Sequence, residues 1–407
     1  MAGTMKTTAF LEEKPLRLTA ADPNEHLLPI SQITADAFAG GQHVAEISQQ
    51  YIGNCHYDWD TTRLIWEGDK LVHHWGVWGY PMRLGGVQLK VAGVGAVVTL
   101  EAYRQQGLMQ TAALASFRAM QENGYDLSIL RGRHYAKFGY VRAWNYITYR
   151  LKPEELPRFA LQSDYHLLGP DQMAAMDALY NESHTDFSGT AVRPTYPMLQ
   201  ASDMNAYGWF DDSGALAGYV RAAPVDDNKT LQCLEAVGNP EQALAVLADL
   251  LPQAPYEAVT FFTLPQAHPV LQIIRQGACV VENQYFYHTG WQVRLVNLAS
   301  TLEKLRPLLE NRLQHSHLAN WRGLLTLDAG KQKAGLWLEN GRITLTSSTD
   351  NDDCIDAGPA LARLLIGSDD PDEIMQQEAI ACTGLGAKLA QVLFPNLHPM
   401  LSQWDEF

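Results

Sequence analysis

The stretch of sequence that decides the fold is VAGVGAVVTLEAYRQQGLM, residues 91–109. Its first half, which ends near Thr99, is rich in valine and is typical of a buried β-strand. Residues 104–109, RQQGLM, then open a segment in which apolar residues from Met109 to Met120 recur at helical spacing. We therefore predict a strand, a short loop and a helix, in that order.

The loop between this strand and this helix predicts an anion site. The first backbone N–H groups of a helix have no partner within the helix, and the helix dipole adds positive potential there. Gly107 has no Cβ, so a phosphate can approach its backbone closely. Neither GxxxxGK[ST] nor GxGxxG occurs, so the sequence does not support a P-loop or a Rossmann dinucleotide site.

The flanking segments extend this unit to about residue 150. Leu127–Leu130 is a second apolar strand, and strand, helix, strand in this order predicts a parallel pair with a helical crossover. Upstream, residues 27–53 favour helices, and Thr62–Trp66 and Leu71–Pro81 favour the two strands of a hairpin. The phrase YAKFGY, residues 135–140, follows the second strand.

Two further modules follow along the chain. Residues 160–290 again alternate between helical and strand-like patterns, with a helix that begins at Asn239. From Trp291 the pattern changes to a helix over 298–314, three strands and two short helices, with a hairpin turn at Asn340 and Gly341. The sequence therefore predicts three packed modules of mixed α/β structure.

Composition excludes several classes of protein. With 407 residues, 46% of them hydrophobic and 18% charged, the chain is typical of a folded globular protein. A net charge of −15 argues against nonspecific binding to nucleic acid or anionic lipid, and favours attraction of cationic ligands. Five scattered cysteines, no apolar leader and no long apolar run predict a cytoplasmic protein without a membrane span.

The combination of residues 104–109, 127–130 and 135–140 resembles the GCN5-related N-acetyltransferase (GNAT) family. That family's pyrophosphate motif reads [QR]xxGx[GA] and a later motif reads roughly Y-x-x-x-G-[FY]; Met109 stands where Gly or Ala is usual. Over essentially the whole chain, the three modules, the run Leu393-Phe-Pro395 and the terminal Asp405-Glu-Phe407 resemble the Eis-type acetyltransferases.

The resemblance implies an α/β fold with two tandem GNAT-like domains followed by a domain of sterol-carrier-protein type. The corresponding ranges are 1–155 for the acetyltransferase domain, 156–290 for a degenerate second one and 291–407 for the last. It also implies acetyl-CoA as co-substrate and a homo-oligomer, either a hexamer or a trimer.

The same resemblance implies which residues bind acetyl-CoA. Val97, Val98 and Thr99 would offer strand N–H and C=O groups to the peptide-like pantetheine arm, and they could equally form an ordinary buried strand. The residues implied at the pyrophosphate are Arg104, Gln105, Gln106, Gly107, Leu108, Met109 and Gln110.

Acetyl transfer from a thioester to an amine requires a deprotonated amine, a stabilised oxyanion and a proton for the departing thiolate. Tyr135, just after the second strand, is predicted to be the general acid; the alternative is a tyrosine packed under the loop with its hydroxyl bonded to backbone. In the Eis-type family the final carboxylate reaches the active site, so Phe407 is expected to be a base or a substrate anchor rather than a frayed terminus.

The expected acceptor is a primary amine of a small polycation, an aminoglycoside or a polyamine, which attacks directly. Acetylation of a protein lysine and an inactive protein whose last module binds a lipid remain the alternatives. Residues that could surround a cation are Asp36, Asp58, Asp60, Asp405, Glu406, Phe38, Trp59, Trp66, Trp75 and Trp78.

Other chemistries find little support. The 13 histidines include no HExxH pattern, and His73 and His74 would point to opposite faces of a strand, so we predict no metal. GxSxG is absent. Cys55 next to His56 could suggest a thiol nucleophile, but neighbours along a chain seldom face each other.

Overall fold

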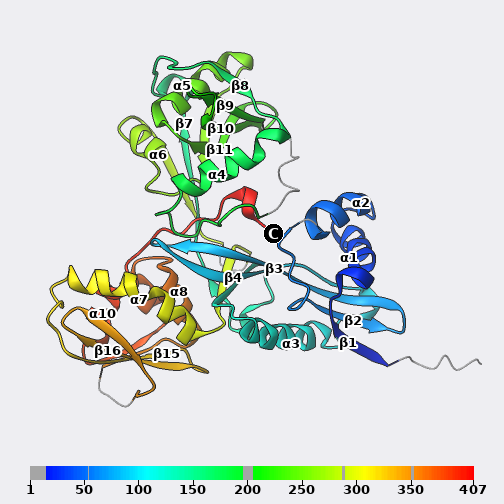
Figure 1. Ribbon diagram of the computed structural model, residues 1–407, viewed down its shortest axis with the longest axis vertical. Coiled ribbons are helices and arrows are strands. Elements are labelled where there is room, and N and C mark those ends of the chain that lie inside the picture. The colour runs from blue at the N-terminus through cyan, green and yellow to red at the C-terminus, as the bar shows by residue number, and fades with distance from the viewer. Residues whose placement is uncertain (1–14, 54, 196–204, 287–288, 350–352) are drawn as a thin grey trace, which may run out of the picture.

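The computed structural model describes residues 15–53, 55–195, 205–286, 289–349 and 353–407. The first fourteen residues of the predicted first domain thus lie outside the described residues. The described chain contains three β-sheets, each with helices packed on it (Figure 1). This arrangement confirms the predicted mixed α/β fold.

The first sheet contains the predicted strand, loop, helix and strand of residues 91–130. Its strands, in spatial order, are β1 (Leu16–Ala20), β2 (Arg63–Glu67), β3 (Lys70–Leu84), β4 (Val87–Thr99), β5 (Leu127–Arg131), β14 (Trp291–Leu295) and β6 (Val141–Arg142). Helix α3 (Leu108–Glu122) connects β4 to β5, which are parallel, so the predicted crossover is confirmed.

Helices cover both faces of this sheet. Helix α3 packs on a core with Trp75, Ala92 and Val94, whereas α1 (Pro23–Phe38) packs on the opposite core with Trp78 and Val98. Asp22 caps α1 by accepting a hydrogen bond from the backbone N–H of Asn24. The short helix α2 (Val44–Glu46) and the π-helical turn η1 (Ile47–Gly53) complete the predicted helical region 27–53.

The second sheet has the order β13-β7-β12-β11-β10-β9-β8. Its strands are β13 (Val280–Gln284), β7 (Tyr146–Leu151), β12 (Ala258–Phe262), β11 (Thr230–Val237), β10 (Leu216–Val225), β9 (Asn205–Phe210) and β8 (Tyr165–Leu167). The helices of this region are α4 (Met173–Ser183), α5 (Pro240–Leu250) and α6 (Pro269–Ile274). Asn239 caps α5 through the N–H groups of Glu241 and Gln242, so the predicted start of this helix is confirmed.

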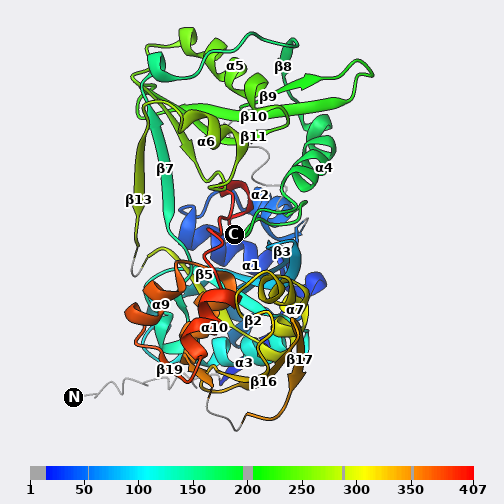
Figure 2. The ribbon, with the colours of Figure 1, turned by 90° about the vertical axis from the view of Figure 1, so that its left-hand side faces the viewer.

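The chain exchanges strands between the first two sheets. β7 leaves the first body and pairs with β12 and β13, and β14 returns to pair with β5 and β6. Figure 2 shows β7 and β13 running together from the lower body to the upper one. Sheet membership therefore departs from sequence order at both predicted boundaries, 155 and 290, because a strand's partner is set by distant pairing rather than by its own residues.

The third sheet packs on the first through one long helix. The sheet consists of β17 (Arg342–Thr346), β16 (Lys333–Glu339), β15 (Gly323–Asp328), β18 (Cys354–Asp356) and β19 (Ala381–Thr383), with α8 (Leu361–Ile366), α9 (Pro371–Gln377) and α10 (Gly386–Leu393) around it. Helix α7 (Leu298–Gln314) buries its leucines in a core shared with β3, β4 and β14. Asn340 and Gly341 have φ angles of 51° and 72°, which confirms the predicted hairpin turn.

The last residues of the chain return to the centre of the molecule (Figure 1). Asp405 is completely buried and forms an ion pair with Arg193, with 3.0 Å between Oδ2 and Nη2. It also accepts a hydrogen bond of 2.6 Å from the hydroxyl of Thr195, while Arg193 pairs with Glu235 of β11. These contacts hold the C-terminal segment against the second sheet.

Four buried histidines predict an acid-sensitive fold. Burial lowers the pKa of His73 and His184 to about 3 and that of His74 and His268 to about 4. The unfolded chain binds these protons near pH ~6.5, so the free energy of unfolding should fall by up to about 1.4 kcal/mol per histidine for each pH unit below that value. Urea unfolding at pH 7.5, 6 and 5 should show a falling midpoint; a constant midpoint would contradict this account.

Candidate active site

Strands β4 and β5 part in the middle of the first sheet. They pair only where Val91–Val94 lie opposite Leu127–Leu130, yet β4 continues to Thr99. Beyond Val94, the edge of β4 that faced β5 has no strand partner among the described residues. Backbone N–H and C=O groups of this edge can pair with an extended, peptide-like ligand.

A β-bulge shapes the free end of β4. The register with β3 shifts between His74 and Gly76, and Ala96 has a φ of 46°. Nδ1 of His74 donates to the carbonyl oxygen of Ala96 at 2.7 Å, and Nε2 accepts from the hydroxyl of Tyr57 at 2.8 Å. Nδ1 of His73 lies 2.7 Å from the hydroxyl of Thr99. Both histidines therefore hold the end of β4.

The predicted pantetheine residues lie along this free edge. Val97 packs partly buried on the α3 side, in the same cluster as Met109 and Tyr135. Val98 is buried on the α1 side. Thr99 ends the strand. Their side chains are used for packing, so their backbone groups are what they can offer to a ligand.

The seven predicted pyrophosphate residues lie together at one exposed helix start. Residues 104–107 are exposed, and Gln105 and Gly107 have φ angles of 63° and 78°. Helix α3 begins at Leu108 without a side-chain cap, which leaves its first N–H groups open. A Cβ built on Gly107 would meet nothing within 4 Å. The loop thus fits a pyrophosphate.

Tyr135 lies just beyond β5, at the start of the short 3-10 helix η3 (Ala136–Phe138). Its ring meets Trp75 edge to face with 5.9 Å between centroids. Its hydroxyl has no hydrogen-bond partner among the described residues, unlike in the alternative of a backbone-bonded tyrosine. Burial raises the pKa of Tyr135 to about 12, so its phenol keeps its proton at neutral pH.

Phe407 lies on the opposite face of β4 from Tyr135. A Cβ on Gly93 would come within 2.6 Å of the Phe407 ring, and one on Gly95 would lie 3.2 Å from both its carboxyl carbon and the hydroxyl of Tyr51. The Phe407 ring also packs against Trp291, with 5.4 Å between centroids. Two glycines at alternate positions of β4 thus make the space that the chain terminus fills.

Side-chain alternation along β4 separates these two groups. Ala92 and Val94 face the α3 core, where Tyr135 packs, and Gly93 and Gly95 face Phe407. The Tyr135 phenol and the Phe407 carboxyl therefore lie on the two faces of the sheet, with the parting of β4 and β5 between them.

Sequence reasoning missed Tyr51, Gly93, Gly95 and His74 as parts of this site. Tyr51 in η1 packs against Trp78 with tilted rings, 4.6 Å between their centroids, and its hydroxyl lies near Gly95 beside the terminal carboxyl. The two glycines inside a valine-rich strand were a visible signal of close approach, but the strand itself does not show what approaches.

Gly93→Ala should displace the Phe407 ring and move its carboxyl with it. Because the added Cβ would fall 2.6 Å from the ring, and misplacement by about 1 Å can cost up to about 100-fold in rate, we expect kcat to fall at least tenfold. Gly86→Ala is a control, since a Cβ there meets nothing within 4 Å, although its φ of 87° adds backbone strain. Steady-state kinetics would check this, and unchanged kcat in Gly93→Ala would argue against it.

The predicted acidic and aromatic residues do not form one cluster around Phe407, although Trp78 lies beside Gly95, close to the Phe407 carboxyl carbon. Asp58, Trp59 and Asp60 line a cavity of about 720 Å³ beside β3, which Tyr135 and Phe407 do not line. Asp58 there accepts a hydrogen bond from the hydroxyl of Tyr125. Trp66, Trp75 and Trp78 are buried in cores, and Phe38 and Asp36 are exposed on α1.

The acidic residues next to Phe407 are already paired. Asp405 is engaged by Arg193, and Glu406 forms an ion pair of 2.7 Å with Arg131. Asp405 and Glu406, two of the candidates to attract a cationic amine, thus have cationic partners within the chain. Their partners, Arg193 and Arg131, lie far from them in the sequence, so no local pattern indicates the pairing.

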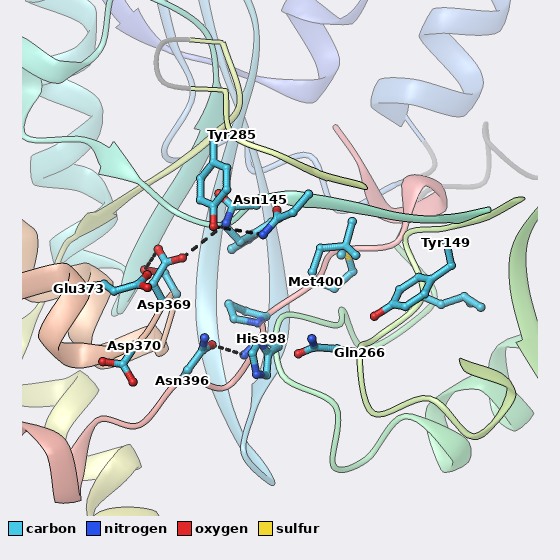
Figure 3. A pocket seen from close by; sticks show the side chains of 16 residues that line it. Asn145, Tyr149, Gln266, Tyr285, Asp369, Asp370, Glu373, Asn396, His398 and Met400 are labelled. Carbon is cyan, nitrogen blue, oxygen red and sulfur yellow. Dashed lines mark hydrogen bonds between the residues drawn. The ribbon is translucent and has the colours of Figure 1, made fainter. Parts of the chain in front are cut away.

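A smaller cavity of about 240 Å³ lies where the C-terminal segment, β7, β13 and the third sheet's helices meet (Figure 3). Tyr149, Tyr285, Asp369 and His398 line it. Asp369 is paired with Arg142 at 3.0 Å and with Arg363 at 2.6 Å. None of the predicted site residues lines this cavity.

The described part of the chain contains neither a metal-binding cluster nor a membrane-spanning helix. No three side chains of His, Cys, Asp or Glu there come together in a way that could hold a metal ion. Within the same residues, no helix combines the length and apolar character needed to cross a bilayer.

Comparisons with known proteins agree with this geometry. Residues 25–143 match the family described as an acetyltransferase (GNAT) domain. No curated protein matches the chain significantly. Solved structures match over nearly the full length at low sequence identity, and so they show the fold.

Three of these structures illustrate the range. The GCN5-related N-acetyltransferase from Anabaena variabilis has a TM-score of 0.75 and 16% identity, covering 95% of this chain and 99% of that one. A probable N-acyltransferase from Enterococcus faecalis has a TM-score of 0.77 and 15% identity, covering 96% and 100%. Eis1 from Mycobacterium abscessus has a TM-score of 0.69 and 14% identity, covering 96% and 100%.

The domain match contains the parted strands, the exposed loop and the start of α3, and the fold match includes all three sheets. Residues 25–143 therefore match the GNAT acetyltransferase domain family, and the chain shares the fold of these solved structures over nearly its whole length.

Proposed function

We propose that this protein is an acetyl-CoA-dependent enzyme that acetylates a primary amine of a small polycation, an aminoglycoside or a polyamine, by direct attack. The observation that carries the proposal is the position of the Phe407 carboxyl. It lies on Gly95, on the face of β4 opposite Tyr135, where β4 and β5 part. A carboxyl and a phenol that could act as base and acid thus lie on the two sides of one opening.

The chain's residues fit acetyl-CoA, which supplies an activated thioester carbonyl when bound. The free edge of β4 from Gly95 to Thr99 can pair with the amides of the pantetheine arm. The open N–H groups at the start of α3, together with Arg104, can hold the pyrophosphate. A backbone N–H of the same edge can stabilise the carbonyl oxygen as charge develops.

Tyr135 can donate the proton that the departing thiolate needs. Its phenol is partly buried, keeps its proton at neutral pH, and has no partner among the described residues that competes for that proton. It follows β5 directly, so it stands at the β5 side of the opening. A group in this position can act as a general acid.

The Phe407 carboxylate can attract the ammonium group and accept its proton. The rings of Trp291 and Tyr80 pack against the Phe407 ring and hold the end of the chain in place. The net charge of −15 draws polycations toward the molecule and favours an acceptor with several amines.

Release of free thiol from acetyl-CoA tests the proposed function. The full-length protein would be assayed with aminoglycosides, polyamines and lysine peptides at neutral to mildly alkaline pH. We expect turnover with the polycations and little with the peptides. Preference for the peptides would overturn the acceptor class, and neither turnover nor an acetyl-CoA-dependent rise in Tm would overturn the function.

We also propose a cellular location and an oligomeric state for the enzyme. The five cysteines are all free thiols, which fits the reducing cytoplasm. We expect a homo-oligomer, a hexamer or a trimer, from the resemblance to Eis-type proteins. Light scattering of the purified protein would measure its mass.

A further inference from the structure

A cavity of about 780 Å³ separates the acetyltransferase domain from the third sheet. Helices α3 and η3 line one side, and residues 329–332 of the turn between β15 and β16 line the other. Three cations, Lys137, Arg294 and Lys331, are among the lining residues, whereas none of the described lining residues is acidic. In a chain with 45 acidic and 30 basic residues, this lining stands out as positive.

Arg294 of β14 is the least compensated of these cations. Its Nη1 donates to the carbonyl oxygen of Phe138, and its guanidinium lies over the ring of Phe117 at 4.3 Å. Its Nε is buried without a hydrogen-bond partner, and Arg294 forms no ion pair with any described residue. A buried guanidinium without a counter-ion is unfavourable, so an anion entering the cavity would be bound strongly.

The other two cations come from different domains and are also available. Lys137 belongs to η3 and places its Nζ 5.0 Å from the ring centroid of Phe138. Lys331 lies on the β15–β16 turn and pairs with no carboxylate among the described residues, whereas Lys333 nearby is held by Asp328 at 2.6 Å. The cavity thus places an exposed lysine of the β15–β16 turn opposite the acetyltransferase domain.

The cavity adjoins the predicted acetyl-CoA site. Gln110, in the first turn of α3, lines the cavity and also belongs to the predicted pyrophosphate loop. η3 follows Tyr135 directly. Coenzyme A carries a phosphomonoester on its ribose, beyond the pyrophosphate. The exposed side chain of Leu114 adds an apolar surface on which the adenine ring of coenzyme A could lie.

We propose that this cavity binds the ribose 3′-phosphate of acetyl-CoA, an inference that rests on the proposed function. Lys331 of the β15–β16 turn completes the site together with Arg294 and Lys137. The third domain then takes part in co-substrate binding. Inorganic phosphate has the same chemistry and is the other possible source of the anion.

Dissociation constants of coenzyme A and 3′-dephospho-coenzyme A, measured by calorimetry on the full-length protein, test the proposal without any acceptor. Since a hydrogen bond to a charged group contributes about 1.5–3 kcal/mol, the wild type should bind coenzyme A about tenfold to a hundredfold more tightly. Lys331→Ala should reduce the ratio of the two dissociation constants at least about threefold, while the affinity for 3′-dephospho-coenzyme A stays unchanged. Lys229→Ala, an exposed lysine on the second sheet, should behave as wild type.

Equal affinity of the wild type for the two compounds would overturn this inference and leave the proposed function standing. Equal loss of both affinities in Lys331→Ala would also overturn it. A Tm raised by inorganic phosphate in wild type but not in Lys331→Ala, with equal affinity for both compounds, would assign the cavity to free phosphate instead. No binding of either compound would overturn the proposed function itself.

Discussion

Tyr135→Phe is expected to lower kcat by about 100-fold or more while the dissociation constant of acetyl-CoA stays near that of wild type. A positioned general acid typically contributes about 10²–10⁴-fold, and the substitution removes only the phenolic proton. The ring contact with Trp75 is kept. Steady-state kinetics and calorimetry on the same preparations measure the two quantities separately.

A matched control and a pH profile sharpen this test. Tyr165→Phe removes the hydroxyl of a tyrosine on the second sheet that donates to Asp249, and it should keep wild-type kcat. Because burial raises the pKa of Tyr135 to about 12, wild-type kcat should not decline on the alkaline side before about pH 10. Unchanged kcat in Tyr135→Phe, or a loss of acetyl-CoA affinity that accounts for the whole effect, would remove Tyr135 from the role of acid.

Appending one glycine after Phe407 is expected to lower kcat by about 100-fold. The extension keeps the aromatic ring but moves the charged carboxylate by up to about 3.5 Å, and smaller displacements already cost about that much in rate. The ring contacts with Tyr80 and Trp291 should hold the segment in place, so the Tm should not change. Kinetics and a melting curve on the extended protein check both expectations.

Phe407→Leu is the matched control for this extension. It keeps the terminal carboxylate and replaces only the ring, so it should retain most of the activity and lose some stability from reduced packing. Full activity of the extended protein would show that the position of the carboxylate does not determine kcat. Equal loss of activity in both variants would show that the packing of the Phe407 ring, rather than the carboxylate, determines kcat.

Local patterns predicted the acetyltransferase unit well because it is built from contiguous elements. The strand β4, the loop and α3 follow each other in sequence, and α7 was predicted with its observed bounds of 298–314. Pairing between distant strands leaves no such local pattern. β13 is exposed along its whole length, and β7 and β14 change sheets, so neither hydrophobicity nor order along the chain indicates their partners.

The residues of the candidate site also fall into those that a local motif predicts and those that distant contacts position. Residues 104–110 were predicted from a motif, and the structure gathers them at one helix start. Phe407 was expected only from the resemblance, because its position depends on contacts with residues far away in the sequence, such as Gly93 and Trp291. The pairing of Asp405 with Arg193, 212 residues away, could not be predicted for the same reason.

Cys55 offers the one covalent route that the sequence suggested, and the structure disfavours it. Its thiol donates to the carbonyl oxygen of Tyr51 at 2.7 Å. Burial raises the pKa of Cys55 to about 11, so little thiolate forms at neutral pH. Direct attack of the amine on the thioester therefore remains the mechanism to test.

One measurement tests the central claim most directly. Enzyme and acetyl-CoA are mixed at comparable concentrations, and the free thiol released is measured with and without a polyamine. If the amine attacks the thioester directly, with Tyr135 as acid and the Phe407 carboxylate as base, no thiol above background is released without the amine. Thiol release should then be continuous after the amine is added. One equivalent of thiol per active site before any amine is present would show an acetyl-enzyme and contradict the account.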